Sequence, residues 1–105
     1  MDSVVETSAA RAVEVVVTED ELVVRLEDGR TITTPLAWYP RLLHASEAER
    51  SRFRLVGRGA GIHWPDLDED LSVAGMLAGR PSGEGPESLK RWLAARQVEG
   101  RANSE

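Results

Sequence analysis

The residues best suited to chemistry lie in one short stretch, IHWPDLDEDLSV, at residues 62–73. His63 could act as a general base or a metal ligand, and Asp68 could orient it or share the metal. Asp66, Asp68 and Asp70 alternate as D-x-D-x-D, which is how a calcium loop begins. The stretch therefore raises two chemical hypotheses: a metal-dependent enzyme that uses His63 and Asp68, and a calcium site.

Each of these hypotheses lacks essential residues. The sixth position of the calcium loop requires glycine and holds Leu71, and the twelfth requires a bidentate glutamate and holds Leu77. A catalytic zinc usually needs about three protein ligands, and the other histidine, His44, falls in a different predicted element. The chain has no cysteine and no G-x-S-x-G elbow for a serine nucleophile. We therefore expect no catalytic residue, no metal and no cofactor, and we do not expect an enzyme.

A structural interpretation accounts for the stretch without further assumptions. Pro65 has no N–H and holds the tryptophan before it in extended geometry, so a strand should end there and the tryptophan should pack into the core. Three consecutive acids from Asp68 precede a helix expected at Ser72, where free N–H groups and the helix dipole favour negative charge. We interpret the following residues as a structural motif: His63, Trp64, Pro65, Asp68, Glu69, Asp70 and Ser72.

The N-terminal third of the chain predicts antiparallel strands. Residues 13–36 are rich in β-branched side chains broken by charged clusters, which indicates two or three strands. The Asp-Gly pair at 28–29 suits the left-handed backbone of a tight hairpin turn. Two registers are open, because a two-residue loop places Thr33 beside Val24, whereas a three-residue loop with a glycine bulge places Ile32 there.

Short helices and a second set of strands should follow. Pro40 suits a first helical turn, and Ser46 with Glu49 matches a capping box, so one helix should begin near Pro40 and another at Ser46. Residues 52–64 indicate a strand, a glycine-rich turn and another short strand, and a short helix should begin after Ser72. The sequence predicts an α+β fold, with a small antiparallel sheet led by a β-hairpin and packed with short helices.

A C-terminal amphipathic helix completes the predicted organisation. Its apolar side chains either dock on the domain's own sheet or give a partner protein an anchor set. These candidate partner-binding residues are Leu89, Trp92 and Leu93. The expected organisation is a flexible tail at 1–11, an α+β domain at 12–79, a linker at 80–86, the helix at 87–97 and a flexible tail at 98–105.

Composition limits the classes of partner. A net charge of −5 argues against general affinity for nucleic acid phosphates. No apolar run approaches the roughly 20 residues that span a bilayer, and the first residues lack the plan of a signal peptide, so we expect a cytoplasmic protein without a membrane partner. The basic cluster that carries the alternative hypothesis, a nucleic-acid-binding regulator, consists of Arg50, Arg52, Arg54 and Arg58.

The stretch at residues 61–73 also resembles a known family. The pattern Gly-Ile-His-Trp-Pro-x-Leu-Asp-Glu-Asp-Leu-Ser-Val before a short helix is similar to the hallmark of the bacterial domain-of-unknown-function family 2442. The resemblance covers about residues 13–79, and Gly75 departs from it at a position where a better helix former is expected. It implies a small α+β fold with a hairpin-led sheet and no established activity.

The resemblance also implies a kind of partner. Members of the family are often encoded beside a small protein of domain-of-unknown-function family 4160, in arrangements that look like toxin–antitoxin pairs. We therefore expect an uncharacterised, non-catalytic protein-interaction module. Its partner would be such a toxin-like protein, to which it would be antitoxin-like, or a second copy of itself in a dimer.

Overall fold

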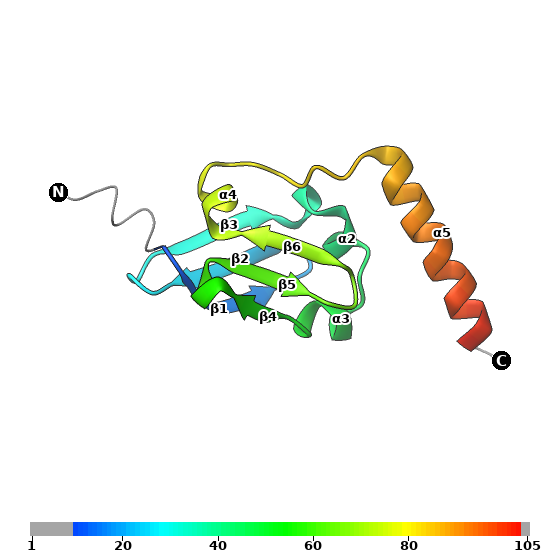
Figure 1. Ribbon diagram of the computed structural model, residues 1–105, viewed down its shortest axis with the longest axis horizontal. Helices are drawn as coiled ribbons and strands as arrows, with labels where there is room; N and C mark the ends of the chain where they lie inside the picture. Colours follow the sequence, from blue (N-terminus) through cyan, green and yellow to red (C-terminus); the bar gives the residue numbers. More distant parts are fainter. Residues whose placement is uncertain (1–9, 104–105) are drawn as a thin grey trace.

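Two three-stranded antiparallel sheets form the body of the molecule in the part of the chain that the structure describes (Figure 1). The computed structural model describes the backbone of residues 10–103 and the side chains of residues 10–97. The strands follow the orders β1-β2-β3 and β4-β5-β6, and short helices connect or follow them. The predicted α+β fold is confirmed, although the strands divide into two sheets.

The first sheet consists of β1 (Ala12–Val17), β2 (Glu21–Leu26) and β3 (Thr31–Pro35). Successive side chains of a strand point to opposite faces, and Leu22, Val24 and Leu26 are completely or almost completely buried on the inner one. The outer face carries an exposed ion pair in which the Arg25 Nε lies 2.9 Å from a Glu14 carboxylate oxygen. One face of this sheet therefore forms part of the core.

The hairpin between β2 and β3 has the three-residue loop. Val24 lies opposite Ile32, and the Leu26 N–H donates to the Arg30 carbonyl at 2.7 Å across the turn. Gly29 has φ of +96°, a backbone conformation that glycine adopts at low cost. Of the two registers left open by the sequence, the one with a glycine bulge forms.

Short helical segments link the sheets: η1 (Leu36–Trp38), α2 (Pro40–Leu43) and α3 (Glu47–Ser51). The Ser46 hydroxyl accepts a bond from the Glu49 N–H at 3.1 Å. A Glu49 carboxylate oxygen accepts one from the Ser46 N–H at 2.9 Å. This reciprocal pair is the predicted capping box, and it restarts the helix after a break.

The second sheet is formed by β4 (Arg54–Val56), β5 (Gly61–Trp64) and β6 (Glu69–Ser72), with η2 (Gly57–Gly59) between the first two. The acids at 68–70 precede the helix that begins after Ser72, as expected, but none of them lies in its first turn. Glu69 and Asp70 belong to β6, where they lie opposite Trp64 and His63 of β5. Asp68 ends the intervening turn with φ of +52°, a conformation for which aspartate is among the more tolerant residues.

The short helix α4 (Val73–Leu77) follows β6 directly. The Gly75 N–H donates to the Ser72 hydroxyl at 2.9 Å, so Ser72 is the predicted N-cap even though the acids before it are not. Val73 and Met76 are buried against the core. Gly79 follows the helix with φ of +74°, which is how a helix commonly ends.

The last helix, α5 (Pro86–Asn103), is longer than the predicted helix at 87–97. Its backbone continues through most of the segment 98–105 that we expected to be a flexible tail. Residues 1–9 and 104–105, on which the remainder of the predicted tails falls, lie outside the described residues. No helix within residues 10–103 is long and apolar enough to cross a bilayer.

The core lies between the two sheets and α2. Its largest fully buried side chains are Trp64, Tyr39, Leu22, Leu26, Leu36, Leu42, Ile62 and Leu67. The Trp64 indole N–H donates to the Arg50 carbonyl at 3.0 Å, which satisfies the one polar atom of that side chain. Trp64 therefore occupies the core, where the sequence places it.

Candidate functional site

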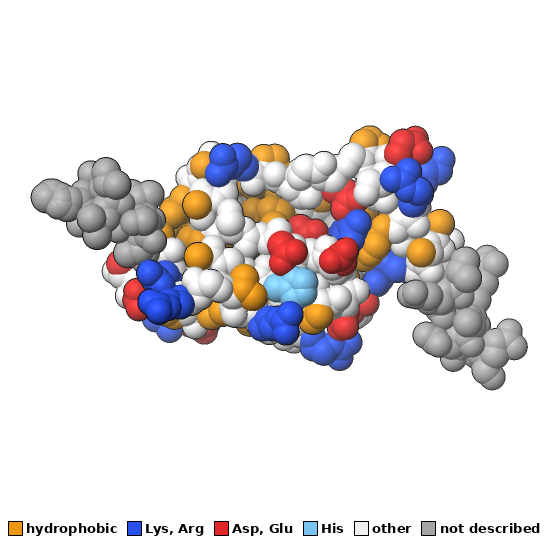
Figure 2. All heavy atoms as spheres, viewed as in Figure 1, with side chains coloured by type: hydrophobic (Ala, Val, Ile, Leu, Met, Phe, Trp, Pro, Cys, Tyr) orange, Lys and Arg blue, Asp and Glu red, His pale blue; other side chains and the backbone are white. Residues whose placement is uncertain are grey.

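Two acidic side chains of the stretch at residues 62–73, Asp66 and Asp70, pair with Arg52 and His63. The His63 Nδ1 lies 2.6 Å from an Asp70 carboxylate oxygen across the β5–β6 pairing. The Arg52 Nε donates to Asp66 at 2.6 Å. On the face drawn in Figure 2, acidic side chains gather over β6 and the segment that crosses above it, with basic side chains around them.

The structure pairs His63 with Asp70, not with Asp68, the residue that the enzymatic hypothesis chose. Asp68 lies in the turn, and its backbone carbonyl is 3.5 Å from an Arg41 nitrogen. Among the side chains that the structure describes, at residues 10–97, no three His, Asp or Glu converge in an arrangement that could hold a metal ion. The D-x-D-x-D spacing therefore brings no calcium-like ligand set together in the described part of the chain.

Two of the four arginines of the basic cluster make local contacts, and two are exposed. Arg50 donates to two carbonyl oxygens at the C-terminal end of α2, each at 2.9 Å, and Arg52 is bound to Asp66. Arg54 and Arg58 are exposed, on β4 and η2. Two of the four are thus engaged in local structure, which weakens the nucleic-acid hypothesis.

Arg41 of α2 connects three separate segments. It donates to both carboxylate oxygens of Glu84, at 2.6 and 3.3 Å, and to the Leu67 carbonyl at 2.9 Å. Hydrogen bonds from Arg41 and from the Ser88 hydroxyl hold the pKa of Glu84 below its ordinary value. Arg41 thereby connects α2 to the β5–β6 turn and to the segment before α5.

Trp92 connects α5 to the body. The Arg41 guanidinium carbon lies 5.2 Å from the centre of the Trp92 ring, and that of Arg96 lies 4.6 Å from it. Arg96 also donates two hydrogen bonds to Glu49 of α3, at 2.9 and 2.8 Å. These bonds hold the pKa of Glu49 at about 2. The attachment of α5 therefore uses cation–π contacts and an ion pair.

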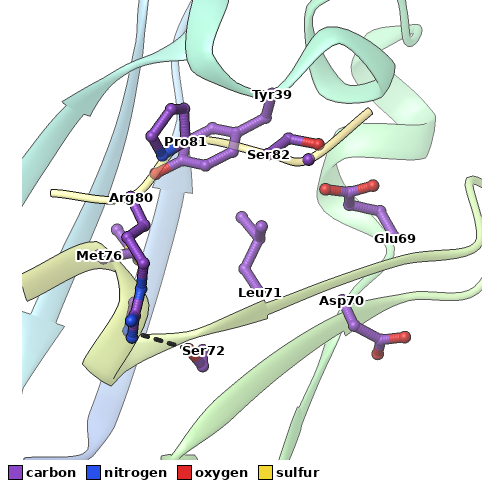
Figure 3. Close-up of a pocket in the computed structure, with 11 residues that line it drawn as sticks. Tyr39, Glu69, Asp70, Leu71, Ser72, Met76, Arg80, Pro81 and Ser82 are labelled. Carbon is purple, nitrogen blue, oxygen red and sulfur yellow. Dashed lines mark hydrogen bonds between the residues drawn. The ribbon is translucent and has the colours of Figure 1, made fainter. Parts of the chain in front are cut away.

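A pocket of about 330 Å³ lies between β6, α4 and the segment that crosses above them (Figure 3). Its walls combine apolar and charged side chains from distant parts of the chain. The lining residues include Tyr39, Glu69, Leu71, Met76, Arg80 and Ser82. This pocket is the candidate functional site of the described residues.

Glu69 is the unusual residue of this pocket. It is only 8% exposed, and its carboxylate accepts no hydrogen bond from any described residue. Burial raises its pKa to about 7; Arg41 acts in the opposite direction, while the charges of Glu84, Asp70 and Asp68 add to the rise. Figure 3 shows the carboxylate turned toward the crossing segment at Ser82.

Tyr39 contributes an aromatic wall. Its side chain is 1% exposed, and its hydroxyl donates to the Thr34 hydroxyl oxygen at 3.2 Å. Burial raises the pKa of Tyr39 above its ordinary value. The tyrosine is thus a neutral, fixed part of the pocket.

Sequence reasoning missed this site because it treated the acids at 68–70 as one capping group. A signal was present, since Leu67, Glu69 and Leu71 recur at every second position, as the inward side chains of a strand do. A glutamate within that series faces the core. The other walls come from segments far away in the sequence, which no local pattern indicates.

Comparisons with known proteins agree on the family and assign no activity. The profile of the family described as protein of unknown function (DUF2442) matches residues 12–82. A crystal structure of a protein of unknown function from Rhodospirillum rubrum ATCC 11170 is 31% identical, with a TM-score of 0.63, over 71% of this chain and 93% of that one. No curated protein matches.

A second solved structure is similar in fold. The solution NMR structure of uncharacterized protein CV0863 from Chromobacterium violaceum has a TM-score of 0.63 and 19% identity, over 90% of this chain and 83% of that one. The family match extends from the first strand to the segment that crosses the pocket, and it confirms the resemblance carried by residues 61–73. The chain belongs to the DUF2442 family of proteins of unknown function.

Proposed function

We propose that the protein is a non-catalytic protein-interaction module and that α5 binds its partner. The observation that carries this proposal is the position of α5, which stands beyond the two sheets (Figure 1). Of the apolar side chains described in α5, Trp92 packs against the core cluster, whereas Leu89 and Leu93 do not. A helix of this kind contributes little to the core and presents most of its surface outward.

The three candidate partner-binding residues have different roles in this proposal. Residues three or four apart lie along one side of a helix, and Ser88, Trp92 and Arg96 form the row that contacts the body. Leu89 and Leu93 lie beside that row and are half-buried. Trp92 positions the helix, and the two leucines offer an anchor pair for a partner.

The partner that we propose is a small protein encoded beside this one, toward which this chain is antitoxin-like. The pairings of His63 with Asp70 and of Arg52 with Asp66 support a structural motif rather than a reaction centre. The chain has no cysteine, which suits a reducing compartment and a cytoplasmic partner. Self-association through the same leucines is the competing outcome.

Co-expression with the neighbouring small protein tests this proposal. The complex should be detected by size-exclusion chromatography with light scattering, and Leu89→Ser with Leu93→Ser should abolish it. The double substitution should lower the free energy of unfolding by less than about 1 kcal/mol, since both side chains are only half-buried. Lys90→Ser with Ala94→Ser, at exposed positions of the same helix, is the matched control and should leave the complex intact.

Two results would overturn the proposal. One is an intact complex with the double leucine variant. The other is cooperative unfolding of that variant at a much lower temperature, because the leucines would then belong to the domain's own core. If light scattering shows that this chain alone forms a dimer, and that the double leucine variant does not, the partner at α5 is a second copy of this chain and not the neighbouring protein.

A further inference from the structure

We propose that the pocket at Glu69 is a binding site for an organic cation, a guanidinium or primary ammonium group on a short alkyl stem. The site lies outside the α5 interface and uses none of its residues. It goes beyond the proposed function, since a binding module needs no such pocket.

The Glu69 carboxylate is buried without a hydrogen bond from any described residue. An ionised carboxylate taken out of water is costly unless hydrogen bonds or an opposite charge compensate it. Glu69 is 8% exposed, on the core side of β6 opposite the fully buried Trp64. It has no hydrogen-bond donor among the described residues, although it lines an open pocket. A ligand that donates hydrogen bonds would supply what the chain does not.

The charges around Glu69 are mainly negative. Asp68, at the end of the preceding turn, and Asp70 of β6 flank Glu69, and the charge of Glu84 acts on it from the segment before α5. Arg41 of α2 is the nearby cation, but it already donates to both oxygens of Glu84. The Arg41 charge is thus largely compensated, and the remaining carboxylates favour a cation over an anion.

The pocket also has room and apolar contacts for the alkyl stem of a cation. Figure 3 shows Arg80 at the opposite side from Glu69, with Leu71 between them. A cation at Glu69 therefore lies away from Arg80. Leu71, Met76 and the Tyr39 ring provide apolar contacts for an alkyl stem. The volume of about 330 Å³ falls at the lower end of the range for small-molecule sites, roughly 300–1,000 Å³.

This chemistry has two sources in a cell. One is a free small molecule with a guanidinium or ammonium group, and the other is an arginine or lysine side chain of another protein. Both would place a charge-assisted hydrogen bond on Glu69, and they differ in what surrounds the cation. The experiment below includes probes of both kinds.

The test is an NMR titration of the full chain with butylguanidinium and with butylammonium at about pH 8, where Glu69 is ionised. We expect saturable shifts of the backbone amides of residues 69–72, Arg80, Ser82 and Gly83 for at least one probe. Glu69→Gln keeps the shape and should weaken binding about tenfold or more, because a charged acceptor is lost. Asp66→Asn is the control, since Asp66 lies outside the pocket and is bound to Arg52; its effect should stay within about threefold.

The pH dependence of probe binding by the wild-type protein tests the proposal without any substitution. Affinity should fall as the pH is lowered through about 7, because protonation of Glu69 removes its charge. The absence of saturable shifts with both probes at about pH 8, or equal binding by Glu69→Gln, would overturn the proposal.

A last arm separates the sources. N-acetyl-Gly-Arg-Gly-amide and its lysine counterpart should bind more tightly than the butyl probes if the natural cation is a protein side chain. Weaker binding of both peptides assigns the site to a free small molecule. The Leu89→Ser with Leu93→Ser variant should bind the probes like wild type, so this inference and the proposed function can fail independently.

Discussion

The side chains of Glu49 and Glu69 are both held largely away from solvent, yet Glu49 has a full set of hydrogen-bond partners, whereas the Glu69 carboxylate has none among the described residues. The Glu49 side chain is 18% exposed, and it accepts hydrogen bonds from Arg96 of α5 and from the Ser46 N–H. Glu69 is 8% exposed and faces a pocket. Glu49 connects α3 to α5 through Arg96, whereas the Glu69 carboxylate connects no two elements of the described chain.

The difference has opposite consequences for stability. The pKa of Glu49 lies at about 2, so its ionised form stabilises the fold. The pKa of Glu69 lies at about 7, so its ionised form opposes folding. A residue that opposes folding is expected where a protein gives up stability for a ligand or partner. Glu49 is therefore a structural contact between helices, and Glu69 is part of a candidate binding site.

The largest predicted effect is the pH dependence that Glu69 imposes. Its pKa of about 7 in the folded state lies above the ordinary 4.5. Its contribution to stability is therefore fully present below about 4.5 and is lost as the pH rises through about 7. The total change is on the order of 3 kcal/mol. Denaturant unfolding of wild type from about pH 5 to 8 should show this fall, and Glu69→Gln should remove most of it.

A wild-type stability that is flat over that interval, or identical slopes for wild type and Glu69→Gln, would contradict this prediction. Asp66→Asn serves as the control, because Asp66 lies outside the pocket, is bound to Arg52 and should leave the slope nearly unchanged.

The next effect concerns Glu49, and its sign is opposite. The pKa of Glu49 is lowered from the ordinary 4.5 to about 2, so its contribution is present above about 4.5 and is lost as the pH falls through about 2. Glu49→Gln should lower the free energy of unfolding at about pH 7 by about 1 kcal/mol, since solvent screens the pair and one helix cap is weakened.

The matched control is Glu47→Gln, in the same first turn of α3 but exposed. It should change the free energy of unfolding by a few tenths of a kcal/mol at most. Equal losses for the two substitutions would show that the bond to Arg96 contributes nothing beyond the general effect of an acid at a helix start.

Trp92 should give a local effect. Trp92→Leu removes a ring contacted by both Arg41 and Arg96, and each such contact is worth about 0.5–1 kcal/mol where exposed. Amide hydrogen exchange in α5 should accelerate while β2 and β5 stay protected. Unchanged exchange in α5 would show that the ion pair between Arg96 and Glu49 is sufficient to hold the helix.

The smallest effect belongs to the pair of His63 and Asp70. The Asp70 side chain is 71% exposed, and exposed ion pairs contribute roughly 0–1 kcal/mol. Asp70→Asn should therefore leave thermal unfolding at about pH 7 nearly unchanged. A large loss of stability would mean that partners on the outer face matter as much as those in the core, which would remove the contrast drawn between Glu49 and Glu69.

The parts of the fold that short-range signals determine could be predicted from the sequence. The Ser46 capping box, the Asp-Gly turn at 28–29 and the Ser72 N-cap each depend on residues within four positions of one another, and each forms. The hairpin register remained open, because loops of two and three residues both agree with the pattern.

The candidate site could not be predicted in the same way. Acidic residues are uncommon in strands, so β6 was not predicted, and Glu69 was grouped with its neighbours as a capping residue. The pocket forms only when Tyr39 and the segment at 80–83 meet β6, and the partner of Glu49 lies on α5. These contacts depend on tertiary structure, on which a local pattern carries no information.

The most direct test of the account is an NMR titration of the side-chain carboxyl carbons of Glu49 and Glu69 in the same sample. The account predicts that Glu69 titrates near pH 7 and Glu49 near pH 2, and that butylguanidinium lowers the midpoint of Glu69 alone. A Glu69 midpoint at the ordinary 4.5, unmoved by the cation, would contradict it.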